Sequence, residues 1–231
     1  MKTKTIIPIA IVAIFVALAF SPAASATQVR VAWVENPDDA TTAKFDKVEL
    51  TDGEYQNLYD VLQSAWTWMM ENHPLSDGQL SEAENATING YINNVKDILA
   101  DSPLIAALTT EQIVSLLLSG SLTKKCVLAV GWGRSLMPFN EYEWGFSGGT
   151  PFIRPLTFMM TLGYTGVLKY RFPLGAMGYD KMGRHLVMVQ GLQGLWIDGG
   201  SLGWERFFKS GIEFVIGRAR VFTVSPIFGS H

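Results

Sequence analysis

The chain has 231 residues, a formal net charge of −3 and a single cysteine, Cys126. Its length is sufficient to bury a substantial core. One cysteine excludes an internal disulfide framework and a Cys/His zinc set, and we interpret Cys126 as a buried thiol within an apolar run. Arg and Lys are scattered among apolar positions, which excludes the dense basic patches of nucleic-acid-binding proteins.

The N-terminus has the pattern of a signal peptide. Lys2 and Lys4 precede an uncharged apolar run at residues 6–20, and the small-x-small triplet 24–26 follows. The run is shorter than the roughly 17–25 residues of a spanning helix. We therefore predict that residues 1–26 are cleaved and that the mature chain is extracytoplasmic, either secreted or at the cell surface. The alternative is an uncleaved anchor, in which residues 6–20 tether the domain to a membrane.

The remaining chain divides by composition near residue 123. Residues 27–123 carry fifteen Asp and Glu against four Lys and Arg, whereas residues 124–231 carry six against twelve. Glycine rises from four residues in the first segment to eighteen in the second. We predict an acidic, mainly helical segment and a basic, glycine-rich β segment, which attract and dock on each other.

The acidic segment opens with an expected strand at residues 29–35. Thr51 with Glu54, and Ser81 with Glu84, form two capping boxes, each before a helical apolar stripe. The first stripe ends at Pro74, and Pro103 interrupts the chain after the second. A third, shorter helix is expected to start at Thr109 and to end near residue 118. We interpret the aromatic and methionine residues of these stripes as core.

The basic segment predicts short strands separated by glycine turns. They are expected at residues 125–131, 156–162, 167–172, 185–191, 195–198, 212–216 and 219–224. Helices followed by strands indicate the α+β class. We therefore predict an N-terminal helical segment packed on a C-terminal, mostly antiparallel, glycine-rich β-sheet or sandwich.

The longest expected loop in the glycine-rich segment, residues 131–155, is the predicted binding site. It combines aromatic, carboxylate, amide and guanidinium groups, which together suit sugars, peptides or other amphipathic ligands. The candidate ligand-binding residues are Arg134, Asn140, Glu141, Tyr142, Glu143, Trp144 and Arg154. The alternative is a solvated loop whose aromatic side chains pack back on the core.

A hydrolase is the competing hypothesis. Glu141 and Glu143 share a face if the segment is extended, roughly 7 Å apart, which is near a retaining-glycosidase separation. Asp180 and His185 suggest an orienting acid and a base. Ser201 lies in the G-x-S-x-G stretch "GGSLG", yet no acid and histidine follow it in the order of an α/β-hydrolase except at the frayed terminus. We therefore interpret this stretch as a glycine turn.

Two further patterns lie around the second capping box. Residues 77–84 match an EF-hand loop only in part, because Leu75 falls on a ligand position that needs an oxygen donor. Asn85-Ala86-Thr87 fits a glycosylation sequon, which requires an exposed asparagine. We predict no metal site, no cofactor and no nucleic-acid partner. The sequence favours an exported, non-enzymatic protein that binds a small ligand or a surface partner.

Overall fold

A computed structural model describes residues 27–36, 43–118, 123–136, 156–171, 173–199 and 211–226. Its strands are β1 (Thr27–Val34), β2 (Ala43–Leu50), β3 (Lys125–Leu136), β4 (Leu156–Arg171), β5 (Gly175–Gln190), β6 (Gln193–Asp198), β7 (Gly211–Ala219) and β8 (Val221–Pro226). They form one eight-stranded sheet in the order β2-β1-β6-β7-β3-β4-β5-β8, and each neighbouring pair is antiparallel. The predicted signal peptide, residues 1–26, lies outside the described residues.

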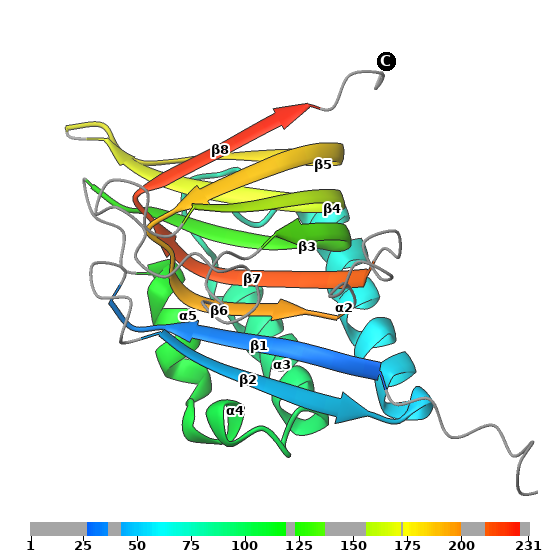
Figure 1. Ribbon diagram of the computed structural model, residues 1–231. Helices are drawn as coiled ribbons and strands as arrows, with labels where there is room; N and C mark the ends of the chain where they lie inside the picture. The colour runs from blue at the N-terminus through cyan, green and yellow to red at the C-terminus, as the bar shows by residue number, and fades with distance from the viewer. Residues whose placement is uncertain are drawn as a thin grey trace, which may run out of the picture.

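Helices cover one face of this sheet (Figure 1). They are α2 (Asp52–Asn72), α3 (Glu82–Ile98), α4 (Pro103–Ala107) and α5 (Thr110–Leu118). The layer is held by one apolar cluster that joins Leu62 and Ile92 of the helices to Val31, Leu128 and other alternate strand residues. Beside the cluster, the indole rings of Trp66 and Trp132 meet edge to face, with centroids 4.9 Å apart. The interface between the helices and the sheet is therefore mainly apolar.

The helix starts confirm both predicted capping boxes. The Thr51 hydroxyl accepts from the Glu54 backbone N–H, and the Glu54 carboxylate accepts from the Thr51 N–H at 2.8 Å. Ser81 and Glu84 repeat this geometry at the start of α3. The predicted third helix is also present as α5. These side chains satisfy backbone donors that have no partner within the first helical turn.

The order of elements corrects one part of the prediction. Two strands precede the helices, and both join the sheet that the later strands build. The α+β class is therefore confirmed, but the helical part lies between strands and is not N-terminal to the sheet. The unpredicted strand, β2, alternates exposed Lys47 and Glu49 with buried Val48 and Leu50, a period of two in a short, charged edge strand. The division near residue 123 stays a prediction.

Strands β3 and β4 continue through glycine residues at which turns were expected. Residues 156–162 and 167–172 were expected to be separate strands, but β4 runs continuously through Gly163. Gly163 lies opposite Gly131, and a Cβ on Gly163 would lie 2.2 Å from the Val130 carbonyl oxygen. The glycine pair therefore permits a close approach of two strands. Residues 131–136, expected in a loop, continue β3 for the same reason.

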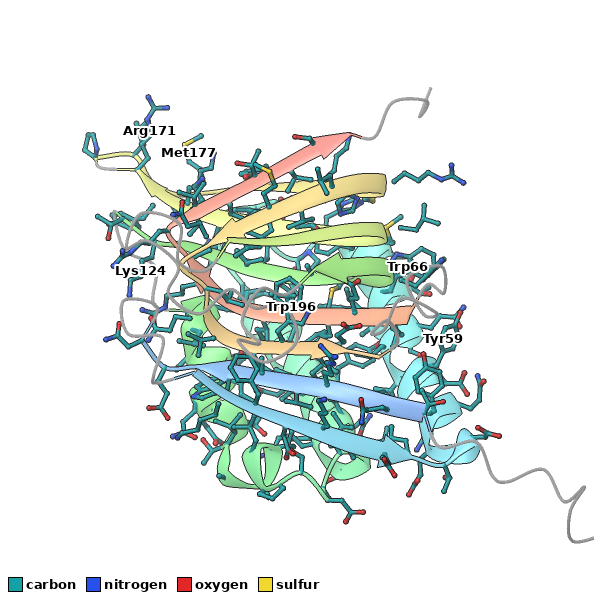
Figure 2. The ribbon with its side chains drawn as sticks, in the orientation of Figure 1. Tyr59, Trp66, Lys124, Arg171, Met177 and Trp196 are labelled. Carbon is teal, nitrogen blue, oxygen red and sulfur yellow. The ribbon has the colours of Figure 1, made fainter. Side chains whose placement is uncertain are left out.

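A second apolar cluster lies on the sheet face opposite the helices. It includes Val127, Val189, Trp196 and Phe222 (Trp196 is labelled in Figure 2), all nearly inaccessible to solvent. None of the helices in the described part of the chain has both the length and the apolar character needed to span a membrane.

Candidate functional site

The predicted binding loop falls almost entirely outside the described residues. Arg134 belongs to strand β3, but its side chain is outside the described part. The other predicted ligand-binding residues are also outside it; they are Asn140, Glu141, Tyr142, Glu143, Trp144 and Arg154. Ser201 lies outside it as well. The loop and the glycine turn at Ser201 stay predictions.

The suggested pair of Asp180 and His185 does not form. The two residues are an odd number apart on β5, so their side chains lie on opposite faces of the sheet. Asp180 instead forms a hydrogen bond with the Nδ1 of His73, which ends helix α2 in a left-handed conformation (φ 50°). This contact fixes the α2–α3 connection on the sheet, and it removes the proposed orienting acid from His185.

His185 has both ring nitrogens engaged. Nδ1 lies 2.7 Å from the Gly183 carbonyl oxygen, and Nε2 lies 2.8 Å from the Thr165 hydroxyl. Because a carbonyl can only accept, Nδ1 carries the proton and Nε2 accepts from Thr165. Burial lowers the pKa of His185 below its ordinary value of 6.5. Both nitrogens of the neutral His185 ring are thus used in hydrogen bonds within the protein, which indicates a structural role.

Cys126 is buried, as the sequence predicts. Its side chain belongs to the apolar cluster under the helices, and desolvation raises the pKa of the thiol. A protonated thiol without solvent access does not act as a nucleophile. Asn85 is half-buried in the first turn of α3, and its glycosylation stays a prediction.

A row of charged residues crosses the face opposite the helices. Arg30 on β1 lies opposite Asp198 on β6, and Asp198 lies opposite Glu213 on β7. Opposite residues of antiparallel strands have Cβ atoms about 4.5–5.5 Å apart, so the two carboxylates are neighbours. They are 2 % and 0 % exposed, and all three side chains interact within the protein. Next in the row, opposite Glu213, is Gly131 of the predicted binding segment.

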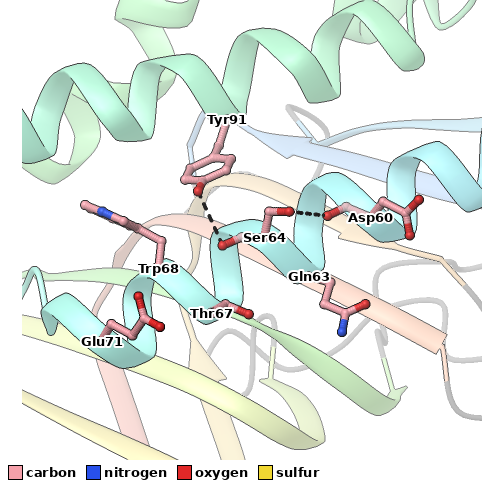
Figure 3. Close-up of a pocket in the computed structure, with 7 residues that line it drawn as sticks. All are labelled: Asp60, Gln63, Ser64, Thr67, Trp68, Glu71 and Tyr91. Atoms are coloured by element: carbon pink, nitrogen blue, oxygen red, sulfur yellow. Dashed lines mark hydrogen bonds between the residues drawn. The ribbon is translucent and has the colours of Figure 1, made fainter.

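An open groove of about 590 Å³ lies between helices α2 and α3 (Figure 3). A polar stripe of α2 forms the floor of the groove, and Tyr91 of α3 forms one wall. The lining residues are Asp60, Gln63, Ser64, Thr67, Trp68, Glu71 and Tyr91. This stripe faces away from the sheet, since the buried residues of α2 lie on the opposite side of the helix. The groove is therefore on the outer surface of the helical layer.

Two half-buried aromatic rings shape this groove. The centroids of Trp68 and Tyr91 are 6.1 Å apart, with ring planes inclined by 49°. The Tyr91 hydroxyl donates to the Ser64 carbonyl oxygen at 3.3 Å, which holds the phenol ring across the groove. Partial burial, together with the carboxylate of Glu71, raises the pKa of Tyr91, so the phenol stays neutral.

The charge of the groove is negative. Asp60 and Glu71 line it, and no basic side chain does. Asp60 and Glu71 are eleven positions apart along α2, which corresponds to about 16 Å along the helix axis at 1.5 Å per residue. Lys96 is the single basic residue on helices α2 to α5, and it donates to the Leu108 carbonyl oxygen. The site therefore combines aromatic faces with two separated negative charges.

Sequence reasoning missed this groove. Aromatic residues in the helical stripes were expected in the core, whereas Tyr91 and Trp68 line a surface groove. Trp68 lies off the buried stripe of α2, with Ser64 one turn before it and Glu71 one turn after it. A large aromatic residue on the polar face of an amphipathic helix is the signal that would have indicated the site.

Among the described residues, no three His, Cys, Asp or Glu side chains gather closely enough to hold a metal ion. In comparisons with protein-family models, with curated proteins and with solved structures, the chain has no match.

Proposed function

We propose that this chain is an exported, non-enzymatic binding protein, and that the groove between α2 and α3 holds a cationic ligand or a cationic segment of a partner. The observation that carries the proposal is the Trp68–Tyr91 aromatic pair flanked by Asp60 and Glu71. Export rests on the signal-peptide pattern of residues 1–26, and an uncleaved tether at residues 6–20 stays the alternative.

The chemistry of the groove favours a cation for two reasons. Aromatic faces attract ammonium and guanidinium groups, by about 0.5–1 kcal/mol at exposed sites. The helical layer contributes a negative field that increases the local concentration of cations and repels anions. Carboxylates about 16 Å apart suit a ligand with two separated positive charges, such as a short basic peptide. The predicted loop at residues 131–155 stays a second proposed contact, for an amphipathic ligand.

Calorimetric titration with an arginine-containing tetrapeptide tests the groove. We expect Trp68→Ala to weaken binding by about tenfold, because it removes a cation–π contact and an apolar wall. Glu71→Gln should weaken it by up to about fivefold, as for an exposed ion pair. Asp97→Asn is the matched control, since Asp97 is an exposed carboxylate of α3 outside the groove.

The result that contradicts this placement is equal binding by wild type, Trp68→Ala and Glu71→Gln. Binding of a glutamate-containing tetrapeptide with the same affinity would also contradict it. In either case the ligand contacts another surface, and Trp144→Ala with Tyr142→Ala would then test the predicted loop.

A hydrolase stays the second candidate function, and one observation favours it. Asp198 and Glu213 place two buried carboxylates side by side, and glycoside hydrolysis uses a pair of carboxyl groups. Both groups are closed to solvent in this structure, which is why we rank binding first. A screen of glycoside, ester and peptide substrates with wild type and Glu213→Gln tests this alternative.

A further inference from the structure

The strands β4 and β5 extend beyond the rest of the sheet as a two-stranded hairpin. The pairing of β3 with β4 ends at Leu168, and β8 pairs only with residues 185–190 of β5. Among the described strands, therefore, none flanks the hairpin from Lys169 onward. Figure 1 shows this tip projecting past the ends of the neighbouring strands. The described tip comprises residues 169–171 and 173–177.

The tip exposes large apolar side chains in several directions. Leu174 in the turn is 68 % exposed, Met177 46 % and Tyr170 45 %. Tyr170 lies opposite Ala176 on the helical side of the sheet, whereas Met177 lies opposite Lys169 on the other side. Gly175 closes the turn with φ 82°, a conformation that other residues seldom adopt. Apolar groups therefore surround the hairpin end and do not form one flat patch.

The charged residues of the tip and of the adjoining end of β3 are basic. Lys169 and Arg171 are exposed on the tip itself, on the same side as Met177. Lys124 and Lys125 lie at the adjoining end of β3, and Lys169 and Lys125 are close enough to repel. Figure 2 labels Arg171 and Met177 at the far end of the hairpin, with Lys124 on the same side of the molecule.

We propose that the β4–β5 hairpin tip is a docking element for the surface of an anionic lipid bilayer. Side chains that point to both faces and to the apex suit a medium that surrounds the tip, whereas a protein partner would contact one face or one edge. Lys169 lies two residue levels behind Arg171, about 7 Å along the strand. Immersion of the apex by about 5–10 Å thus places Leu174 among acyl chains and the cations among lipid phosphates.

Vesicle co-sedimentation of the exported chain tests this proposal, with phosphatidylcholine alone and mixed with phosphatidylglycerol. We expect binding to the mixed vesicles, weaker binding at high salt, and little binding to phosphatidylcholine. The double variant Leu174→Ser/Met177→Ser should bind at least about tenfold more weakly, and Arg171→Gln about fivefold. Phe45→Ser is the control, because Phe45 is an exposed residue (48 %) on β2, at the opposite edge of the sheet from the hairpin. Wild type and all variants are compared as the predicted mature chain that starts at Thr27, so residues 6–20 do not contribute to vesicle binding.

A site-specific readout locates the contact. The chain has one cysteine, Cys126, which is buried, so Leu174→Cys can be labelled selectively with a polarity-sensitive fluorophore. We expect a blue shift with mixed vesicles for this label, and none for a label at Phe45→Cys on the opposite edge of the sheet. The proposal is overturned if wild type does not bind mixed vesicles, or if the Leu174/Met177 variant binds as wild type does. Capture of a protein through an intact tip, without vesicle binding, would replace the bilayer with a protein partner.

Discussion

The connection between α2 and α3 packs directly against the backbone of β5, and one methyl group tests this contact. A Cβ placed on Gly178 would lie 1.6 Å from the carbonyl oxygen of Leu75 and 2.7 Å from its carbonyl carbon. Both atoms belong to the backbone, so no side-chain rotation relieves the overlap. Ordinary contact requires a separation of roughly 3.4 Å or more, and the connection must therefore move by nearly 2 Å in Gly178→Ala.

The loss of stability in Gly178→Ala follows from the packing that this movement disturbs. Overpacking of a close-packed site costs about 1–3 kcal/mol, and we expect the upper end because Leu75 is itself fully buried. For a domain of this size, 1 kcal/mol shifts Tm by about 2–4 °C. We therefore expect Gly178→Ala to lower Tm by about 6–12 °C, measured by circular dichroism.

Gly90→Ala supplies a control with the same chemical change and the opposite sign. Gly90 lies in the interior of α3, where a Cβ would meet nothing within 4 Å. Alanine favours the helix over glycine by about 1 kcal/mol, so Tm should rise by about 2–4 °C. A Gly178→Ala protein as stable as wild type would refute the packing of the α2–α3 connection on β5, whereas a stabilised Gly90→Ala protein would show that the assay resolves such effects.

Three further predictions concern polar contacts. Burial lowers the pKa of His185 below 6.5, so as the pH falls the unfolded chain binds a proton at this residue before the folded chain does. The free energy of unfolding should therefore decrease as the pH falls below about 6.5. Urea denaturation across this range should show a weaker decrease in His185→Gln, and an unchanged pH dependence would contradict the assignment. Tyr164→Phe leaves the Leu75 N–H without its acceptor and should cost about 1–3 kcal/mol, measured by the same method. Ser81→Ala removes the cap of α3 and should cost about 1 kcal/mol; no loss of stability would mean that the capping box with Glu84 contributes nothing.

Local signals in the sequence were sufficient for the helices. A capping box specifies where a helix starts from four adjacent residues, and the apolar stripe specifies which side is buried. Both kinds of information are local, which is why α2, α3 and α5 agree with the prediction. The short helix α4 was missed because Pro103 was interpreted as an interruption. The structure places Pro103 in the first turn, where its missing N–H costs nothing and Ser102 caps the helix.

Strand lengths and the candidate site depended on non-local contacts. Gly131 and Gly163 resemble turn residues in isolation, and only their pairing across β3 and β4 makes them strand residues. The groove likewise requires Tyr91 of α3 to lie against Trp68 of α2, and no pattern within either helix specifies that distance. The separation of Asp180 from His185 follows from the parity of their spacing along β5. The strand expected at residues 185–191 does not include Asp180, so the sequence alone did not allow this argument.

The groove and the hairpin tip carry opposite charges. Asp60 and Glu71 line the groove on the outer side of the helices, whereas Lys169 and Arg171 lie at the hairpin tip. Because charges further apart than about 8–10 Å are largely screened at physiological salt, we expect the two surfaces to act independently of each other. Salt should therefore weaken both proposed interactions, but Glu71→Gln should alter only the binding of a cationic peptide and Arg171→Gln only the binding of anionic vesicles. Such a crossed result would distinguish two separate sites from a general effect of net charge, in which both variants would change both interactions.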